Sequence, residues 1–215
     1  MQMANGLFTA EWNSVRALGE KRSFCAGEFL YLQGESDIGL ICLVKGRIRN
    51  SFSFASGAEK TMSIVEGPAI IGETAVIDGG ASICSPRAMT DVEAVMIQRD
   101  VARTFIESHP NFMLLLLQNY TKIIRGLELQ TESLILNTTQ KLARLLVNFR
   151  AYGFYYPHPD DENIQVTHEI LASFLGVSRT KITEALVLFE EKKLIRKSRG
   201  RIEILARDGL KALYE

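Results

Sequence analysis

The chain lacks a long hydrophobic segment, since its longest unbroken apolar run covers only residues 112–117. A membrane-spanning helix needs roughly 18 apolar residues. The N-terminal region also lacks the basic-then-apolar pattern of a secretory signal. The three cysteines, Cys25, Cys42 and Cys84, are odd in number and widely spaced, which fits reduced thiols better than a disulfide framework. We therefore predict a cytoplasmic protein with no membrane partner.

Catalytic signatures are also missing. The sequence contains no zinc-binding His-Glu-x-x-His, no nucleophile elbow Gly-x-Ser-x-Gly and no phosphate-binding Gly-x-x-x-x-Gly-Lys. These absences exclude the enzyme classes that depend on the motifs, and we predict that the protein is not an enzyme.

Charge is balanced over the whole chain, with 25 Lys and Arg against 25 Asp and Glu, but it is unevenly distributed. Residues 1–109 hold 10 basic and 13 acidic residues, whereas residues 138–215 hold 13 basic and 10 acidic ones. Residues 178–201 alone hold eight basic and three acidic residues. Such a concentration of positive charge in one small region favours a polyanionic partner.

Residues 167–184 carry the most informative pattern, which predicts two short helices joined by a tight turn. Gly176 supplies a left-handed residue that ends the first helix, and Ser178 is a good N-cap for the second. Apolar residues recur at helical spacing, namely Ile170, Leu171, Phe174, Leu175, Ile182, Ala185, Leu186 and Phe189. The pattern is that of a helix-turn-helix, and an ordinary helical hairpin with a charged solvated face is the alternative.

The second of these helices would present polar side chains outward from its first turns, at Arg179, Thr180, Lys181 and Glu184. The chain then enters an alternating hairpin with a basic turn. A winged helix uses such a hairpin as a second phosphate contact, so this segment favours DNA binding over the ordinary helical hairpin.

Between residues 22 and 100, short apolar segments alternate with turn residues. We expect strands at 28–33, 40–44, 47–54, 60–65, 70–76 and 88–97. Ile48, Phe52 and Phe54 are expected on one face of the third. Short strands at this spacing predict a β-sandwich or jelly-roll barrel.

Residues 110–137 predict one long helix that begins at Pro110. A seam runs along it with alternating spacings of three and four, through Met113, Leu116, Tyr120, Ile123, Leu127, Gln130 and Leu134. Such a heptad seam predicts a dimerisation helix in a coiled coil. The alternative is a helix that packs on its own barrel, and flanking Leu115, Leu117 and Ile124 would let one helix do both.

These patterns predict an α+β chain with three parts: an effector-sensing barrel (1–109), a dimerisation helix and hinge (110–137) and a winged helix-turn-helix domain (138–215). Asn137 is expected to cap the helix that follows, with Gln140 reaching back to it. Residues 151–163 are expected to form a surface connection.

The order of barrel, long helix, hinge and winged helix-turn-helix resembles the catabolite-activator/FNR (Crp/Fnr) family of bacterial transcription regulators. Segments 27–35, 44–49, 71–79 and 176–179 carry the likeness. The resemblance implies a cyclic-nucleotide-binding-like jelly roll and a homodimeric, sequence-specific regulator that a small molecule controls from the barrel. Binding of that effector would shift the hinge near Asn137 and re-aim the DNA-reading helices. Double-stranded DNA, a second copy of the chain and RNA polymerase are the implied partners.

The resemblance also implies roles for single residues. Arg179 matches the arginine that the family directs at a guanine, and an arginine can donate a bidentate pair to guanine O6 and N7. Thr180 and Glu184 differ from well-known members, which predicts a different operator. Glu184 could accept from a cytosine amino group. The remaining expected DNA contacts are Thr167, His168, Ser178, Lys181, Lys197, Arg199 and Arg201.

The effector is not identified by the resemblance. Cyclic-nucleotide binders of the family hold the phosphate with an Arg-Ser pair after the Gly-Glu segment, whereas residues 80–85 contain no arginine. The first histidine, His109, follows the barrel, and there is no N-terminal cysteine cluster. We therefore expect no haem, metal or iron–sulfur cofactor. The remaining candidates for the effector are a small organic molecule in the barrel or no ligand at all. The family layout places the pocket at Glu73, Ser82, Met113, Leu117 and Tyr120.

Two other functions stay open. An effector-binding module that signals through protein contacts would use the C-terminal domain for docking, although the basic wing argues against it. A barrel enzyme of the cupin type would need histidines in the barrel, where the sequence has none.

Overall fold

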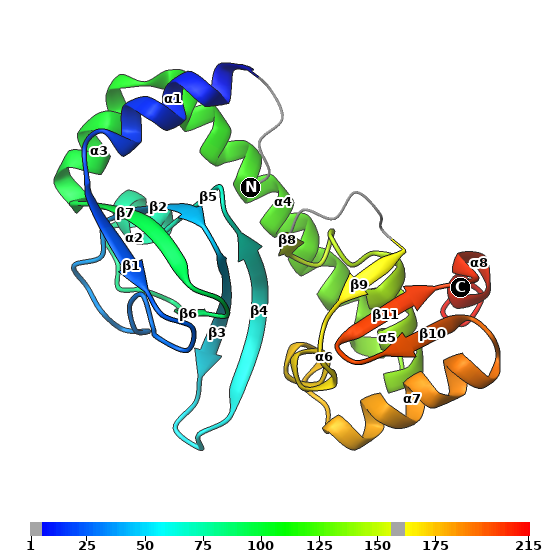
Figure 1. Cartoon of the computed structure of the whole chain (residues 1–215). Helices are drawn as coiled ribbons and strands as arrows, with labels where there is room; N and C mark the ends of the chain where they lie inside the picture. The colour runs from blue at the N-terminus through cyan, green and yellow to red at the C-terminus, as the bar shows by residue number, and fades with distance from the viewer. Residues whose placement is uncertain (1–5, 156–161) are drawn as a thin grey trace. The chain divides into compact units, whose positions relative to one another are not determined.

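The computed structural model describes residues 6–155 and 162–215 (Figure 1). It divides into two compact units: an N-terminal unit of the residues up to Ile123 together with Tyr155, and a C-terminal unit that begins at Ile124 and contains the other described residues. Their boundary lies inside one helix, α4 (Pro110–Glu132), so the three-part division by sequence stays a prediction. In the described part of the chain, no helix is long and apolar enough to cross a membrane.

Two antiparallel sheets form the barrel of the N-terminal unit, as the sequence predicts for a jelly roll. The first has the order β1 (Glu20–Phe24), β7 (Val92–Ile97), β2 (Leu40–Lys45) and β5 (Ala69–Ile71). The second includes β6 (Ser85–Ala88), β3 (Arg47–Ser53) and β4 (Glu59–Glu66) side by side.

The central strand β2 of the first sheet is buried on both faces. One face packs against the second sheet through residues such as Ile41, Leu43 and Ile48. The other face, with Cys42 among its residues, packs against apolar side chains of α1 (Gly6–Arg16), α3 (Arg99–Ser108) and the start of α4. A fully buried Leu or Ile side chain contributes about 1.5–3 kcal/mol. The near-continuous apolar run of β2 is therefore explained by burial on both faces.

Several predicted strands are wrong in detail. Residues 28–33 are largely irregular and bent, apart from a single bridge between Phe29 and Arg87. The segment 70–76 ends its strand at Ile71 and continues as α2 (Glu73–Asp78), because Gly72 adopts a left-handed conformation with φ 83°. The segment 88–97 is interrupted after Ala88, so its two ends belong to different sheets.

The third predicted strand loses its regular alternation. The pairing of β3 with β4 shifts register between Asn50 and Ser51. Ser51 is buried in consequence, and Phe52 only partly so. Phe54 lies beyond the end of β3 in the hairpin turn and is 52% exposed. The helix α1 has no counterpart among the sequence predictions.

Helices and a small sheet make up the C-terminal unit. After α4 come the 3-10 turn η1 (Ser133–Ile135), α5 (Thr138–Val147), α6 (His168–Leu175), α7 (Arg179–Glu191) and α8 (Arg207–Lys211). The short β8 (Phe154–Tyr155) follows α5, and β9 (Asn163–Gln165) precedes α6. The wing consists of β10 (Ile195–Ser198) and β11 (Arg201–Ile204), with β9 pairing on β11.

The segment after α5 is not simply a surface connection. Tyr152 and Phe154 are 2% and 1% exposed, and Phe154 stacks on Phe149 with ring centroids 4.1 Å apart. Aromatic packing of this kind adds to the burial of apolar area. Residues 156–161 of the predicted connection lie outside the described residues.

Candidate nucleic-acid interface and effector site

The first helix of the helix-turn-helix ends at Gly176 and the second is capped by Ser178, as predicted, and Thr167 also caps the first. Thr167 Oγ1 accepts the Ile170 N–H at 3.3 Å, and Ser178 Oγ accepts the Lys181 N–H at 3.4 Å. Gly176 ends α6 with φ 68°, a conformation that costs residues with a Cβ more than glycine. Each cap satisfies an N–H group that the first turn of its helix leaves free.

The two faces of α7 differ as the sequence predicts. Ile182, Ala185, Leu186 and Phe189 are buried. The predicted DNA-reading residues Arg179, Thr180, Lys181 and Glu184 are all exposed. They lie in the first turns of the helix, where the free N–H groups and the helix dipole favour an anion. The residues are therefore accessible to a DNA groove.

Lys197, a predicted DNA contact in the wing, binds the wing to α7. The Lys197 N–H donates to Glu190 Oε1 at 3.0 Å, and Lys197 Nζ lies 3.0 Å from Glu190 Oε2. These hydrogen bonds lower the pKa of the Glu190 carboxyl. Arg201 in turn donates to Asn163 Oδ1 on β9. Lys197 and Arg201 thus have structural partners, whereas Arg199 is exposed at the turn.

His168 connects the two helices of the motif. Its Nδ1 lies 2.9 Å from Thr183 Oγ1, and the Thr183 hydroxyl donates to the Arg179 carbonyl at 3.0 Å. Since that hydroxyl has one proton, we assign Nδ1 as the donor to Thr183. Burial, followed by the charges of Lys197 and Arg179, lowers the pKa of His168. His168 therefore aligns α7, and Thr183 is a positioning residue that the sequence did not reveal.

A polar cluster surrounds Glu73 in the N-terminal unit. Glu73 begins α2 and is only 7% exposed, and burial raises the pKa of its carboxyl. Burial, followed by the charges of Cys84 and Glu73, also raises the pKa of Tyr31, whose phenol hydrogen-bonds with the Ser82 side chain. Tyr120 is close to Glu73 and hydrogen-bonds with Thr74. The structure thus brings Glu73, Ser82 and Tyr120 together.

Tyr31 completes this cluster, although no sequence motif points to it. No local motif identifies a tyrosine whose partners are 42 or more positions away. Met113 and Leu117, the other predicted pocket residues, are 39% and 55% exposed on α4. Within the described residues, no group of three or more His, Cys, Asp or Glu side chains could hold a metal ion.

The exposed apolar face of α4 differs in register from the predicted seam. Leu116 is 2% exposed and packs in the core of the N-terminal unit, so its assignment to the dimer seam is wrong. Leu117 is 55% exposed, and Ile124 at 54% is more exposed than the predicted Ile123 at 37%. An alternative seam fits the exposure: Met113, Leu117, Tyr120, Ile124, Leu127, Thr131 and Leu134. It keeps spacings of four and three.

Comparison with known proteins gives a consistent picture. The model of the "Cyclic nucleotide-binding domain" matches residues 21–109, and the model of the "Crp-like helix-turn-helix domain" matches residues 140–213. The chain belongs to the Crp/Fnr family. It is a transcription regulator of the Crp type, with a DNA-binding helix-turn-helix domain after a cyclic-nucleotide-binding-like barrel.

Two curated relatives support this membership. The "CRP-like cAMP-activated global transcriptional regulator" of Mycobacterium tuberculosis is 24% identical over 177 residues, which cover 80% of this chain and 78% of the relative. The "cAMP-activated global transcriptional regulator CRP" of Salmonella typhimurium is 26% identical over 168 residues, covering 76% and 79%. Both relatives are named as transcription regulators.

A solved structure shares the fold of this Crp/Fnr member. The CooA mutant from Carboxydothermus hydrogenoformans aligns with a TM-score of 0.78 at 16% identity, covering 94% of this chain and 90% of that one. At this identity the likeness concerns the fold alone. The order of barrel, long helix and helix-turn-helix is thus that of the family.

Proposed function

We propose that the protein is a homodimeric, sequence-specific DNA-binding regulator whose helix α7 enters the major groove. The observation that carries this proposal is the exposed first turn of α7, which contains Arg179 and Lys181. The opposite face of the helix is apolar and buried, and this packing fixes the position of the helix. Arg179 would read a guanine through its bidentate donors, with Thr180 and Glu184 at neighbouring bases. Ser178, Lys181, Thr167 and Arg199 would contact phosphates, and RNA polymerase would be a further partner.

The exposed seam, which runs along α4 and ends at Leu134 in η1, supports the homodimer. Its apolar members include Met113, Leu117, Ile124, Leu127 and Leu134, none of which is less than 39% exposed. A helix that left this face in water would expose an apolar stripe, which a second copy of the chain would cover. Two protomers would place their α7 helices in successive major grooves about 34 Å apart.

The effector of this regulator would be a small organic molecule that contacts the cluster around Glu73. Cyclic AMP is the activator named for the curated relatives. In this chain residues 80–85 contain no arginine to neutralise a buried phosphate, which supports a different ligand. We propose no metal or haem cofactor, no catalytic activity and a cytoplasmic location, where bacterial DNA is found.

Selection of bound duplexes from a random DNA pool by the purified full-length protein tests the proposal. We expect enrichment of a pseudo-palindrome with half-sites about one helical turn, 10–10.5 base pairs, or a multiple of it apart. A protein that enriches no sequence and whose DNA binding does not depend on salt would instead fit a module that signals through protein contacts.

A further inference from the structure

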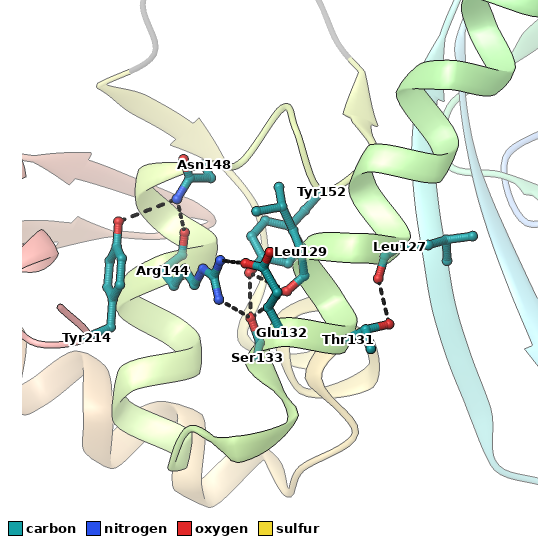
Figure 2. Close-up of polar contacts among 9 residues, drawn as sticks. All are labelled: Leu127, Leu129, Thr131, Glu132, Ser133, Arg144, Asn148, Tyr152 and Tyr214. Carbon is teal, nitrogen blue, oxygen red and sulfur yellow. Dashed lines mark hydrogen bonds and ion pairs between the residues drawn. The ribbon is translucent and has the colours of Figure 1, made fainter.

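Within the C-terminal unit, the end of α4 is bonded to α5 and to the segment after α5 by a set of side chains that we call the junction network: Glu132, Ser133, Arg144 and Tyr152 (Figure 2). Arg144, on α5, forms an ion pair with Glu132 in the last turn of α4. Its Nη1 also donates to Ser133 Oγ at 3.4 Å. One guanidinium therefore contacts two residues that precede Asn137, from a helix that follows it.

Tyr152 contacts the same turn from a third segment. Its phenol oxygen lies 2.7 Å from Ser133 Oγ and 3.3 Å from the Leu129 carbonyl. Ser133 Oγ donates its single proton to the Leu129 carbonyl at 2.7 Å, so Tyr152 is the donor to Ser133. Both side chains are buried, at 2% and 5% exposure. Loss of either partner would remove a short buried hydrogen bond from this turn.

Further contacts brace the segment around Asn137. The side chain of Asn137 accepts the Gln140 N–H at 3.0 Å, while Gln140 Oε1 accepts the Asn137 N–H at 3.1 Å. On the opposite side of Arg144, the ring of Tyr214 lies 6.0 Å from the guanidinium carbon. Asn137, near which the hinge is predicted, is thus held by its own capping box. Arg144, on the helix after Asn137, is bonded to residues that precede Asn137.

The helix α4 also contacts the segment after α5 at an earlier position, Gly126. A Cβ built on Gly126 would lie 2.8 Å from the Ala151 carbonyl oxygen, which is closer than side-chain carbons tolerate. The glycine therefore permits the backbone of α4 to contact the segment that carries Tyr152. The division between the two compact units, at Ile123 and Ile124, falls just before this point.

We propose that the junction network makes α4 from Gly126 onward part of the DNA-binding body, so that the joint that re-aims α7 lies in α4 before Gly126 and not at Asn137. Glu132, Ser133, Arg144 and Tyr152 are then positioning residues for DNA recognition, and this role rests on the proposed function. Allosteric signals from the barrel would then reach α7 through bending of α4, and the segment 129–148 would follow as one rigid piece.

Hydrogen exchange of the full-length protein without DNA tests the joint independently of DNA binding. In the wild type we expect the amides of 129–133 and 141–148 to share one slow opening, and those of 119–124 to exchange faster. Tyr152→Phe and Arg144→Gln should accelerate both slow segments together, by about tenfold or more. Glu107→Gln, which removes the exposed Arg103–Glu107 pair on α3, is the matched control and should change neither.

The opposite pattern would overturn the proposal. Amides of 129–133 that exchange separately from 141–148, or fast exchange confined to residues 136–137, would place the joint at Asn137. The wild type alone decides this if a variant fails to fold. A protein that shows the shared opening but selects no DNA would contradict the proposed function and leave the joint intact.

Discussion

The two units differ in the burial of the polar groups at their candidate sites, which are exposed in the C-terminal unit and buried in the N-terminal unit. In the C-terminal unit, Arg179, Thr180 and Lys181 are consecutive, belong to one turn of α7 and are all exposed. In the N-terminal unit, Glu73 and Tyr31 are buried, and their partners come from distant parts of the chain. The basic residues of α7 are hydrated and free for a polyanion, whereas the carboxyl of Glu73 is desolvated.

This difference separates the two functions of the molecule. A surface that reads DNA needs only a capped helix with correct side chains on its outer face, and a local sequence pattern describes it fully. A buried polar cluster depends on residues brought together by tertiary packing, and every buried polar group in it needs a partner. In the proposed function, ligand recognition in the barrel would therefore depend on tertiary packing, whereas DNA recognition would depend on a local sequence pattern.

The contrast between buried and exposed positions is sharpest at two adjacent residues of α4. We expect Leu116→Ala to lower the free energy of unfolding by about 2–5 kcal/mol, because it leaves a cavity in the core of the N-terminal unit. Leu117→Ala should leave the stability of the monomer nearly unchanged and weaken the dimer. Denaturant titration combined with sedimentation measures both. Equal loss of stability in the two variants would contradict the register of the exposed seam.

At the DNA-reading surface, Arg179→Ala should cost about 1–3 kcal/mol on the selected duplex and relax the preference at one base pair. Fluorescence anisotropy with matched and single-substituted duplexes measures this loss. Lys192→Ala, which removes an exposed charge at the other end of α7, is the control. If both variants lose affinity equally, Arg179 contributes charge and does not read a base.

The capping box at the start of α5 gives a smaller effect. Asn137→Ala should lower the free energy of unfolding by about 1 kcal/mol, because the Gln140 N–H loses its acceptor. Thermal unfolding followed by circular dichroism measures the change. Asn137→Asp is the matched control and should retain most of the stability, since an Asp side chain accepts the same hydrogen bond. An alanine variant as stable as the wild type would show that the cap is dispensable.

The smallest effect is expected from His168, whose ring is only partly buried. Its pKa is lowered in the folded protein, so the unfolded chain binds the proton more readily. The contribution to stability is present above the ordinary pKa of 6.5 and is lost as the pH falls through the lowered value. His168→Gln should therefore lose less stability than the wild type between pH 7 and pH 5. Parallel stability–pH curves from urea titration would contradict the assignment.

The sequence predicts features that depend on neighbouring residues well, and features that depend on tertiary packing poorly. Gly176 and Ser178 define the bounds of α6 and α7, because a left-handed turn and an N-cap act within a few residues. The heptad spacing identifies α4 as a helix with an apolar stripe. It does not show whether Leu116 or Leu117 belongs to the exposed stripe, because several leucines in succession allow two registers. Packing of the helix against the barrel determines which of the two is buried.

Other features escape sequence analysis for the same physical reason. Segment 70–76 is apolar throughout, so only the conformation of Gly72 separates β5 from α2. Thr183 resembles any exposed helical threonine until His168 is seen 2.9 Å away. The buried role of Tyr152 depends on Ser133, which precedes it by 19 residues.

The stoichiometry and salt dependence of the complex with the selected duplex test the central claim most directly. Sedimentation equilibrium should find two chains on each pseudo-palindromic duplex, and the logarithm of the binding constant should fall linearly with the logarithm of salt concentration. A single chain on each duplex, or an affinity that does not change with salt, would contradict a dimer that presents two α7 helices to DNA.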